Sequence, residues 1–469
     1  MTPRIPRRDF LRASLVLGGS AAFFGSSTPL TGLARAQTAT SGPASAPLRD
    51  DRFYVFCYFS GGWDVLLGLD PRDPAVFNNG SLSATRIQPA YELMPAADQA
   101  PVRLDVGSRP RIFGPYIGEL AGPSLVDRLA VVRGLSMDTL THEVGRRRWL
   151  TGHQPSGLSA RGSSAGTWLA SALGVGEPIP NLVVGAETYN VDQPTYASAL
   201  KVATGNDLLR ALRPAGPTLS PALLRRVEDH LAAQAACPVG RRSPLWTSAE
   251  ESRVATADML SRRLDALFDF TANTPDMLGL RSRYGMNVGL GLGTPEAQAA
   301  MAAQALVGGI SRAVTIEVAG GLDTHFNNWT TQQGPAQRRG FNAVARLARH
   351  LQETEFYTDD GSSWLDHTVI VGFSEFSRTP MLNAALGRDH HLTNSCFLLG
   401  GPIRGVDVGA SSDDGMLPQP IDLATGAVVQ DGGGEIVKPD HVLQTLFDDV
   451  GLGNRPDLRV PGIAALLRA

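Results

Sequence analysis

The chain of 469 residues contains only three cysteines, Cys57, Cys237 and Cys396. Three thiols allow at most one disulfide within the chain, which excludes a fold stabilised by several disulfides. Cys57 and Cys396 lie inside apolar, strand-like runs, and we expect both to be buried free thiols. The fold must therefore depend on a hydrophobic core, and this length suffices for one large α/β domain or two ordinary ones.

The chain also has little net charge. Its formal charge is −3, with 19% charged and 43% hydrophobic residues. No global basic field points to nucleic acid or an acidic membrane surface as a partner. The composition is that of a soluble, globular protein, and we find no internal repeat.

Long hydrophobic runs are missing as well, even at the N-terminus. The weakly apolar run from Ala13 to Ser26 is too short to span a bilayer comfortably. It follows the twin arginines Arg7 and Arg8, and it precedes the small-x-small sequence Ala34-Arg-Ala36. We interpret residues 1–36 as a removable twin-arginine (Tat) export signal, against the alternative of a disordered basic arm with a chance arginine pair.

The expected route is therefore export through the Tat translocon to the periplasm or beyond. No cysteine lies near the predicted cleavage site, so we expect no lipid anchor and no stable membrane attachment. Residues 37–50 are small and polar, which is typical of a flexible linker. The remaining residues, 51–469, are expected to form the folded α/β domain.

The order of apolar patterns in the second half predicts a parallel sheet. Strand-like runs at 313–319 and 368–373 flank an amphipathic helical pattern at 341–351. A strand, a helix and a strand in this order form a βαβ unit. Residues 200–310 carry leucines at three- and four-residue intervals, which predicts a largely helical insertion or cap.

Acids and histidines follow the strand-like runs. The run at 54–60 leads to Asp64, the run at 313–319 to Asp323 and His325, and the run at 368–373 to Glu375 and Arg378. Open α/β sheets bind ligands outside the carboxyl ends of their strands, so these side chains are expected to converge.

Two further groups extend this pattern. A short strand at 129–133 leads to His142, and Asp389-His390-His391 follows the last strand closely. Carboxylates with imidazoles suit Zn²⁺ and can also hold Mn²⁺, Mg²⁺ or Ca²⁺. We predict one or two divalent ions, with zinc among the candidates, and a common point within about 5 Å of five side chains. The five are Asp64, Asp323, His325, Glu375 and His390.

Each group also has a plain structural interpretation. In this interpretation Asp64 only caps a helix or closes a turn, and Glu375 is a helix-start acid that makes a surface salt bridge with Arg378. The arginines 146–148 fit either a solvated helical face or an anion-binding role beside the site. The remaining histidines are expected to be structural or solvated, namely His153, His230, His350, His367 and His441.

Together these segments resemble the exported domain-of-unknown-function family 1501, over most of residues 52–455. The resemblance rests on the signal and on five blocks, namely Gly61-Gly-Trp-Asp64, Thr141-His142 before Leu150-Thr-Gly152, Gly321-Leu-Asp-Thr-His325, Ser374-Glu-Phe-Ser-Arg378 and Asp389-His390. It implies the alkaline phosphatase and sulfatase superfamily. The implied fold is a doubly wound, mostly parallel sheet with helices on both faces and a metal site.

The resemblance also implies roles for single residues. Asp64 matches the first metal acid, Asp323 and His325 supply one metal, Glu375 follows a later strand, and His390 matches the late histidine ligand. We add Asp389 to the metal group, and we assign Thr141, His142 and Arg378 to the catalytic group, with Thr141 or His142 near the nucleophile position. The chain departs from alkaline phosphatases in the close spacing of Asp323 and His325, and in having Ser374-Glu375 where they have Asp-His.

Two functions remain open at this point. The nearest sulfatase-like string, Cys237-Pro-Val-Gly-Arg241, has its proline one place early, so an ordinary sulfatase mechanism is not expected. The first hypothesis is a metal-dependent hydrolase acting on a small or polymeric phosphate or sulfate ester, with Thr141 or an activated water as nucleophile. The second is a catalytically silent exported binding or scaffold protein that retains the fold.

Overall fold

The computed structural model describes residues 51–106, 109–157, 159–213, 220–238, 242–261, 263–357, 360–430 and 432–468. The predicted export signal 1–36 and linker 37–50 lie outside these residues. The described chain divides into two compact units, which we treat separately. One consists of residues 206–269, and the other contains residues 51–205 and 270–468.

An eight-stranded sheet organises the larger unit. The strands run in the order β12-β4-β11-β8-β1-β7-β5-β6. Their bounds are β1 Phe53–Phe59, β4 Leu129–Ser136, β5 Asn181–Val184, β6 Leu200–Val202, β7 Ala313–Ala319, β8 Thr368–Phe373, β11 Thr393–Gly400 and β12 Asp407–Val408. All neighbours pair in parallel except β11, which is antiparallel to β4 and β8. The predicted mostly parallel α/β sheet is confirmed.

The central strands β1 and β8 are buried along their whole length because both faces of the sheet are covered. All seven residues of β1 and all six of β8 are buried. A continuous run of this kind is typical of a parallel strand between two helical layers. Cys57 on β1 and Cys396 on β11 are buried free thiols, as predicted, whereas Cys237 is exposed.

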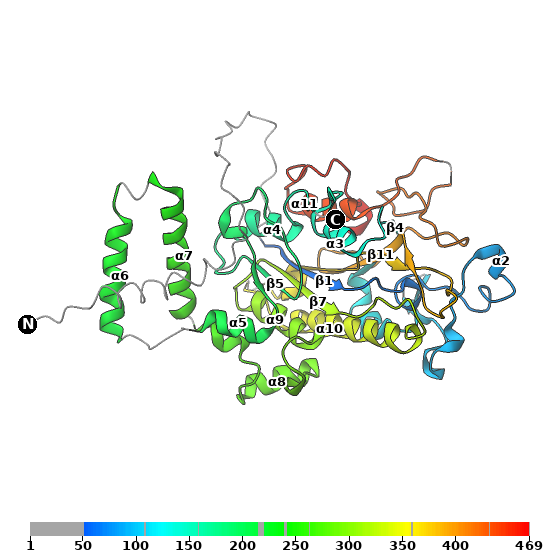
Figure 1. Ribbon diagram of the computed structural model, residues 1–469, viewed down its shortest axis with the longest axis horizontal. Helices are drawn as coiled ribbons and strands as arrows, with labels where there is room; N and C mark the ends of the chain where they lie inside the picture. The colour runs from blue at the N-terminus through cyan, green and yellow to red at the C-terminus, as the bar shows by residue number, and fades with distance from the viewer. Residues whose placement is uncertain are drawn as a thin grey trace, which may run out of the picture. The chain divides into compact units, whose positions relative to one another are not determined.

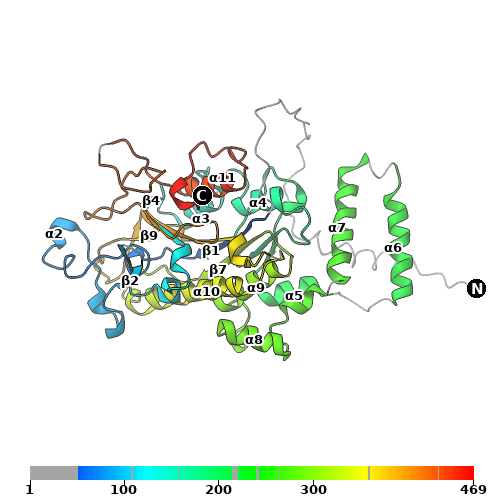
Figure 2. The same ribbon diagram turned by 180° about the vertical axis from the view of Figure 1, so that it is seen from behind.

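Helices cover both faces of the sheet (Figures 1 and 2). The helices α3 (His142–Thr151), α4 (Ala165–Leu173) and α11 (Pro439–Asp449) lie on one face, and α9 (Pro295–Val307) and α10 (Gly334–Glu353) lie on the other. Helix α10 connects β7 to β8, so the predicted βαβ unit is present. It packs Phe341 against Phe59 of β1, with ring centroids 4.8 Å apart.

The segment predicted as a helical insertion begins with a strand. Strand β6 joins the main sheet, and five helices follow, namely α5 (Gly205–Leu212), α6 (Pro221–Ala235), α7 (Pro244–Ser261), α8 (Pro275–Tyr284) and α9. Within the smaller unit, α6 and α7 are joined by an ion pair between Glu228 and Arg253. None of the helices in the described chain is long and apolar enough to cross a membrane.

Short elements include α2 (Leu82–Thr85), the hairpin of β2 (Val102–Val106) with β3 (Arg109–Phe113), and the small pair β9 (Ser377–Arg378) and β10 (His390–His391), besides several short 3-10 helices. The β9–β10 pair lies just beyond the sheet edge at which β8 ends. His390 of β10 pairs with Arg378 of β9.

Candidate metal centre

The sheet topology brings four distant segments to one edge. Strands β1, β4, β7 and β8 run in the same direction, so their carboxyl ends share an edge. Strand β11 runs the opposite way, and its first residue, Thr393, pairs with Ser136 at the end of β4. The segment that precedes β11 therefore lies at the same edge as the segments that follow the parallel strands.

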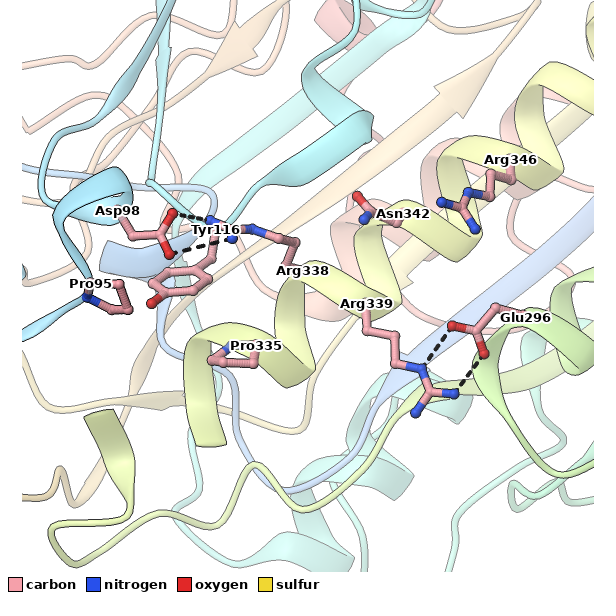
Figure 3. Close-up of a pocket in the computed structure, with 9 residues that line it drawn as sticks. All are labelled: Pro95, Asp98, Tyr116, Glu296, Pro335, Arg338, Arg339, Asn342 and Arg346. Atoms are coloured by element: carbon pink, nitrogen blue, oxygen red, sulfur yellow. Dashed lines mark hydrogen bonds and ion pairs between the residues drawn. The ribbon is translucent and has the colours of Figure 1, made fainter. Parts of the chain in front are cut away.

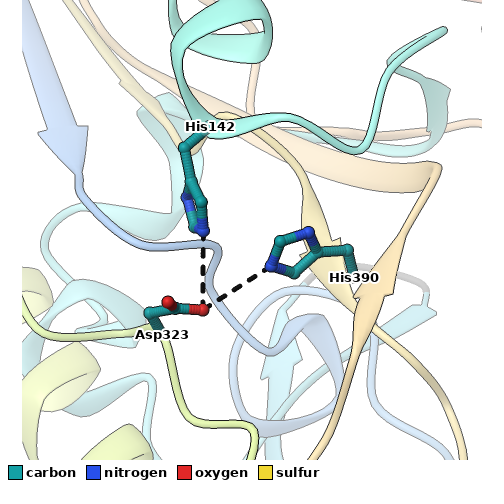
Figure 4. A group of neighbouring side chains, drawn as sticks. All are labelled: His142, Asp323 and His390. Atoms are coloured by element: carbon teal, nitrogen blue, oxygen red, sulfur yellow. Dashed lines mark ion pairs between the residues drawn. The ribbon is translucent and has the colours of Figure 1, made fainter.

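Three histidines surround one carboxylate at this edge. The Nε2 atoms of His142, His325 and His390 lie 3.5, 3.0 and 3.5 Å from Oδ1 of Asp323. Figure 4 shows His142 and His390 approaching Asp323 from different segments. The Nε2 atoms of His325 and His390 are 3.0 Å apart. We call these four residues the three-histidine cluster.

The other ring nitrogen of each histidine, Nδ1, faces an oxygen atom. The pairs are His142 with Oε1 of Glu375 at 2.7 Å, His325 with Oδ1 of Asp389 at 2.8 Å, and His390 with the carbonyl oxygen of Leu140 at 2.7 Å. A carbonyl oxygen or an ionised carboxylate only accepts, so each Nδ1 must donate. In the neutral ring, the proton on Nδ1 leaves the lone pair on Nε2, and the three lone pairs point toward the cluster.

The carboxylates around the cluster favour their ionised forms. Burial opposes ionisation of Glu375, but hydrogen bonds from His142 and from the backbone N–H of Gly61 outweigh it and lower the pKa. Burial likewise opposes ionisation of Asp323, whereas Arg378 lowers its pKa. The hydrogen bond with His325 lowers the pKa of Asp389. All three groups carry negative charge at neutral pH.

The histidines respond differently to this charge. Burial lowers the pKa of His142, but Glu375 and Asp323 together raise it above the ordinary value. Burial lowers the pKa of His390, and the positive charge of Arg378 adds to this effect. Without an ion, the carboxylates attract a proton to His142. A divalent cation would displace that proton, as is usual when a metal binds to histidine.

Arg378 fixes the position of Asp323. Its side chain is fully buried, and Nη2 donates to Oδ1 of Asp323 at 2.7 Å. The same guanidinium donates to the carbonyl oxygens of Gly61 and Gly62. Three carboxylates and one guanidinium leave the cluster and its partners with two net negative charges, which suits a divalent cation.

Five side chains were predicted to share a common point, and the structure separates them. Asp323, His325 and His390 lie together. Glu375 instead contacts Nδ1 of His142, which the prediction had placed in the catalytic group and whose Nε2 lies 3.5 Å from Oδ1 of Asp323. Asp389 likewise contacts the far side of His325. Both acids support ring nitrogens, a relation that spacing along the chain does not reveal.

Asp64 serves other partners. Its side chain is fully buried and caps the short helix Val65–Leu67 by accepting from the N–H of Leu66 at 3.0 Å. The other oxygen accepts from the indole of Trp329 at 2.9 Å and pairs with the buried guanidinium of Arg388 at 3.0 Å. These contacts match the plain interpretation of Asp64 as a cap, and Asp64 is not among the groups around Asp323.

Thr141 and His391 lie beside the cluster. Thr141 is the exposed N-cap of α3, and among the described residues no serine, threonine or cysteine side chain is hydrogen-bonded to the cluster. His391 follows His390 in the short strand β10, so its ring points to the opposite side. Its Nδ1 lies 3.2 Å from the carbonyl oxygen of Thr393.

Sequence reasoning missed two residues that complete the site. The buried ring of Phe376 lies against His390 and His142, with centroid distances of 4.1 and 4.7 Å. Asn383 donates to Oδ1 of Asp389 at 3.1 Å and to the carbonyl oxygen of His325 at 2.9 Å. Phe376 lies inside a block already singled out, whereas nothing in the sequence distinguishes Asn383 from other loop asparagines.

Two glycines allow the segments to meet. Gly61 has a φ of +110°, and a Cβ there would lie 2.7 Å from the backbone nitrogen of Asp323. A Cβ at Gly145 of α3 would lie 2.4 Å from the carbonyl oxygen of Glu375. At Gly61 the end of β1 packs closely against the loop that follows β7. At Gly145 helix α3 packs closely against the segment that follows β8. Both approaches are open only to glycine.

The arginines 146–148 are paired within the protein. Arg146 donates to Glu187 at 2.7 Å, Arg147 donates to the hydroxyl of Tyr189 at 3.0 Å, and the buried Arg148 donates to Asp440 at 3.0 Å. The solvated-face interpretation therefore does not hold for Arg148. No anion is needed to account for these three contacts.

A hollow of about 290 Å³ lies elsewhere, along the start of α10. Its lining residues include Arg338, Arg339 and Arg346 (Figure 3). Each is already paired, since Arg338 donates to Asp98, Arg339 to Glu296 and Arg346 to Glu119. None of the residues that line the hollow belongs to the cluster. Its chemistry is that of neutralised ion pairs, so we place the functional site at the cluster.

Comparison with known proteins agrees with the family that the sequence resembles. The family described as "Protein of unknown function (DUF1501)" matches residues 116–420. No curated protein matches the chain. Among solved structures, a protein in the alkaline phosphatase superfamily from Vibrio parahaemolyticus is similar at 10% identity and a TM-score of 0.36, over 96% of this chain and 76% of that chain.

The phosphonate monoester hydrolase of Agrobacterium radiobacter is similar at 14% identity and a TM-score of 0.27, over 85% of this chain and 74% of that chain. Likenesses this weak carry no argument about the site. The family match is different, because it spans more than half of the chain and includes all four residues of the three-histidine cluster. This protein belongs to the DUF1501 family.

Proposed function

We propose that this protein is a metal-dependent hydrolase that acts on a phosphate or sulfate ester or a related anionic group. The observation that carries the proposal is the convergence of three Nε2 lone pairs on Oδ1 of Asp323. Histidine nitrogens with a carboxylate oxygen are a ligand set that zinc accepts. The second ring nitrogen of each ligand histidine is bonded to an acceptor, as is usual in metal sites.

The ligand set favours one ion rather than two. His142, His325, His390 and Asp323 would hold it, while Glu375 and Asp389 are engaged with the far nitrogens of two of these rings. A divalent ion here would polarise an ester oxygen and offset its negative charge. The protein residues orient the ligands, since Glu375 and Asp389 hold two imidazoles in one tautomer and Arg378 holds Asp323.

A second candidate function is a binding or scaffold protein that uses the same site without turnover. What favours it is the lack of a hydrogen-bonded hydroxyl or thiol at the cluster among the described residues, with Thr141 exposed beside it. Such a protein would bind the anionic ligand but release it unchanged.

Export through the Tat pathway completes the proposal. Its support is the twin arginines Arg7 and Arg8, the short apolar run, and the sequence Ala34-Arg-Ala36. A fusion of residues 1–50 to a reporter that reaches the periplasm only when folded tests this part. Replacing both arginines by lysine should then keep the reporter in the cytoplasm.

The central experiment combines metal content with turnover. Protein purified without chelators is expected to contain about one divalent ion per chain and to hydrolyse phosphate or sulfate esters. Asp323→Asn should abolish both without unfolding the protein. Bound metal without turnover of any ester would support the binding protein instead, and protein that neither contains nor binds a divalent ion would contradict both.

A further inference from the structure

Four exposed apolar residues border the three-histidine cluster, next to the polar side chains of Asp389 and Thr141. Phe326 and Leu386 are 66% and 56% exposed, and Leu140 and Leu392 are each 44% exposed. Single exposed apolar side chains are common on soluble proteins, so exposure alone carries no meaning. These four are unusual because they border the cluster along the chain or through backbone contacts, Phe326 and Leu386 beside His325, and Leu140 and Leu392 beside His390.

The first pair lies beside His325. Phe326 follows His325 directly and forms a bridge with Leu386. Asn383 holds the two segments together, since its side chain donates to the carbonyl oxygen of His325 and accepts from the N–H of Gly387 at 3.0 Å. Leu386 has a φ of +61°, a conformation that leucine rarely adopts and that tends to occur at functional sites.

The second pair lies beside His390. The carbonyl oxygen of Leu140 accepts from Nδ1 of His390, and the carbonyl oxygen of Leu392 accepts from the N–H of Met137 at 3.0 Å. Leu392 is two residues from His390, at the bend between β10 and β11. The buried ring of Phe376 adds an apolar surface under His390 and His142.

We propose that Phe326, Leu386, Leu140 and Leu392 bind an apolar group of the substrate, so that the natural substrate is an anionic ester of a long-chain or aromatic alcohol. This inference rests on the proposed function, which assigns binding of the anionic group of the substrate to the three-histidine cluster. A protein partner is a poorer fit, because four side chains fall far short of the roughly 20–30 residues a side of a stable interface. One alkyl chain or aromatic ring matches their number.

Binding of non-hydrolysable ligands tests this inference without requiring turnover. Ethylphosphonate and hexylphosphonate carry the same anionic group and differ only in apolar length. Calorimetry with zinc-loaded protein is expected to give about tenfold tighter binding for hexylphosphonate, because its added methylenes are partly buried. Equal affinities, or no binding of either ligand, would overturn the inference.

Variants localise the effect. Phe326→Ser and Leu386→Asn should bring the two affinities within about twofold while leaving ethylphosphonate binding unchanged, and Phe326→Leu should keep the preference. Asparagine tolerates the backbone conformation of Leu386. Val175→Ser is the control, because Val175 is 72% exposed and precedes β5, at the opposite edge of the sheet from the cluster. A preference that survives both Phe326→Ser and Leu386→Asn would contradict the assignment.

Turnover of ethyl and hexyl phosphate separates this inference from the proposed function. The two esters have leaving groups of matched chemistry, so any difference in kcat/KM reflects binding of the chain. If hexylphosphonate binds more tightly but neither ester is hydrolysed, the hydrolase proposal fails and this inference stands. If both esters are hydrolysed with equal kcat/KM and the phosphonates bind equally, the hydrolase proposal stands and this inference fails.

Discussion

The Nε2 atoms of His325 and His390 face each other at 3.0 Å. Both rings have their protons on Nδ1, where Asp389 and the carbonyl oxygen of Leu140 accept them. Two lone pairs at this distance repel each other, and the guanidinium of Arg378 offsets part of this repulsion by donating from Nη1 to Nε2 of His325 at 3.3 Å. A proton can bind to Nε2 of only one ring at a time, whereas one metal ion can bind to Nε2 of His325, His390 and His142 together.

Zinc should therefore stabilise the protein. After treatment with a chelator, zinc at 100 times its Kd is expected to add about 2.7 kcal/mol to the free energy of unfolding. Thermal unfolding with and without zinc measures the effect. His390→Ala should abolish the shift, whereas His230→Ala, an exposed histidine of α6, should keep it. Equal shifts in both variants would place the ion elsewhere.

Neutralising Glu375 and neutralising Asp389, the two acids that hydrogen-bond to histidines of the cluster, should lower the zinc affinity to different extents. Glu375→Gln removes a buried charge at 2.7 Å from Nδ1 of His142, and we expect zinc affinity to fall about 10- to 100-fold. Asp389→Asn should cost less, because the side chain of Asp389 is 56% exposed and water can replace it. Competition with a chromogenic chelator gives both affinities. A larger loss of zinc affinity in Asp389→Asn than in Glu375→Gln would contradict this prediction.

Asp64 offers a test of stability against ligation. It is the buried ion-pair partner of Arg388, so Asp64→Ala should destabilise the fold by about 3–5 kcal/mol, because an unpaired buried guanidinium remains. Zinc affinity of the folded variant should stay within about twofold, since Asp64 lies outside the cluster. Denaturant unfolding and zinc titration separate the two effects. A small change in stability with a large loss of zinc would identify Asp64 as a ligand after all.

Gly61 should tolerate no side chain. Gly61→Ala combines a left-handed φ of +110° with a Cβ that would meet the backbone at Asp323, so we expect a loss of roughly 1–3 kcal/mol together with weaker zinc binding. Gly291→Ala is the matched control, because Gly291 has a φ of +85° and open space around its Cβ position. That variant should lose stability but keep its zinc affinity.

Glu317 should make stability depend on pH. Burial, and then the negative charge of Glu375, raise its pKa from 4.5 to about 7. The folded protein therefore binds more protons than the unfolded chain between these values, and this group lowers stability as pH rises from 4.5 to 7. Glu317→Gln should remove that loss and add roughly 1–3 kcal/mol at pH 8. Urea unfolding at pH 5 and pH 8 measures it, and no gain at pH 8 would contradict the shift.

Much of the fold was predictable because its signals are local. Mostly apolar runs identified β1, β7 and β8, and the helical period of residues 341–351 identified the core of α10. Local signals failed at β6, because three residues are too short to show a period. They also could not show that β11 runs antiparallel, since direction depends on pairing with β4 and β8.

The candidate site, like the fold, was predictable only in part from the sequence. Residue type and position after a strand pointed to Asp323, His325 and His390, but the same features pointed equally to Asp64. Only packing separates them, because a carboxylate becomes a structural partner or a candidate ligand according to what lies opposite it. Arg388 and Trp329 lie opposite Asp64, whereas three imidazoles lie opposite Asp323.

The sequence by itself determined the family, the parallel sheet and the chemical types of the candidate ligands, because apolar period and residue identity are properties of neighbouring positions. The tertiary structure decided which nitrogen of each histidine faces the cluster and which acids only support those rings. It also placed Phe326 beside Leu386. These relations join residues that are far apart in the chain, so they exist only once the strands have paired.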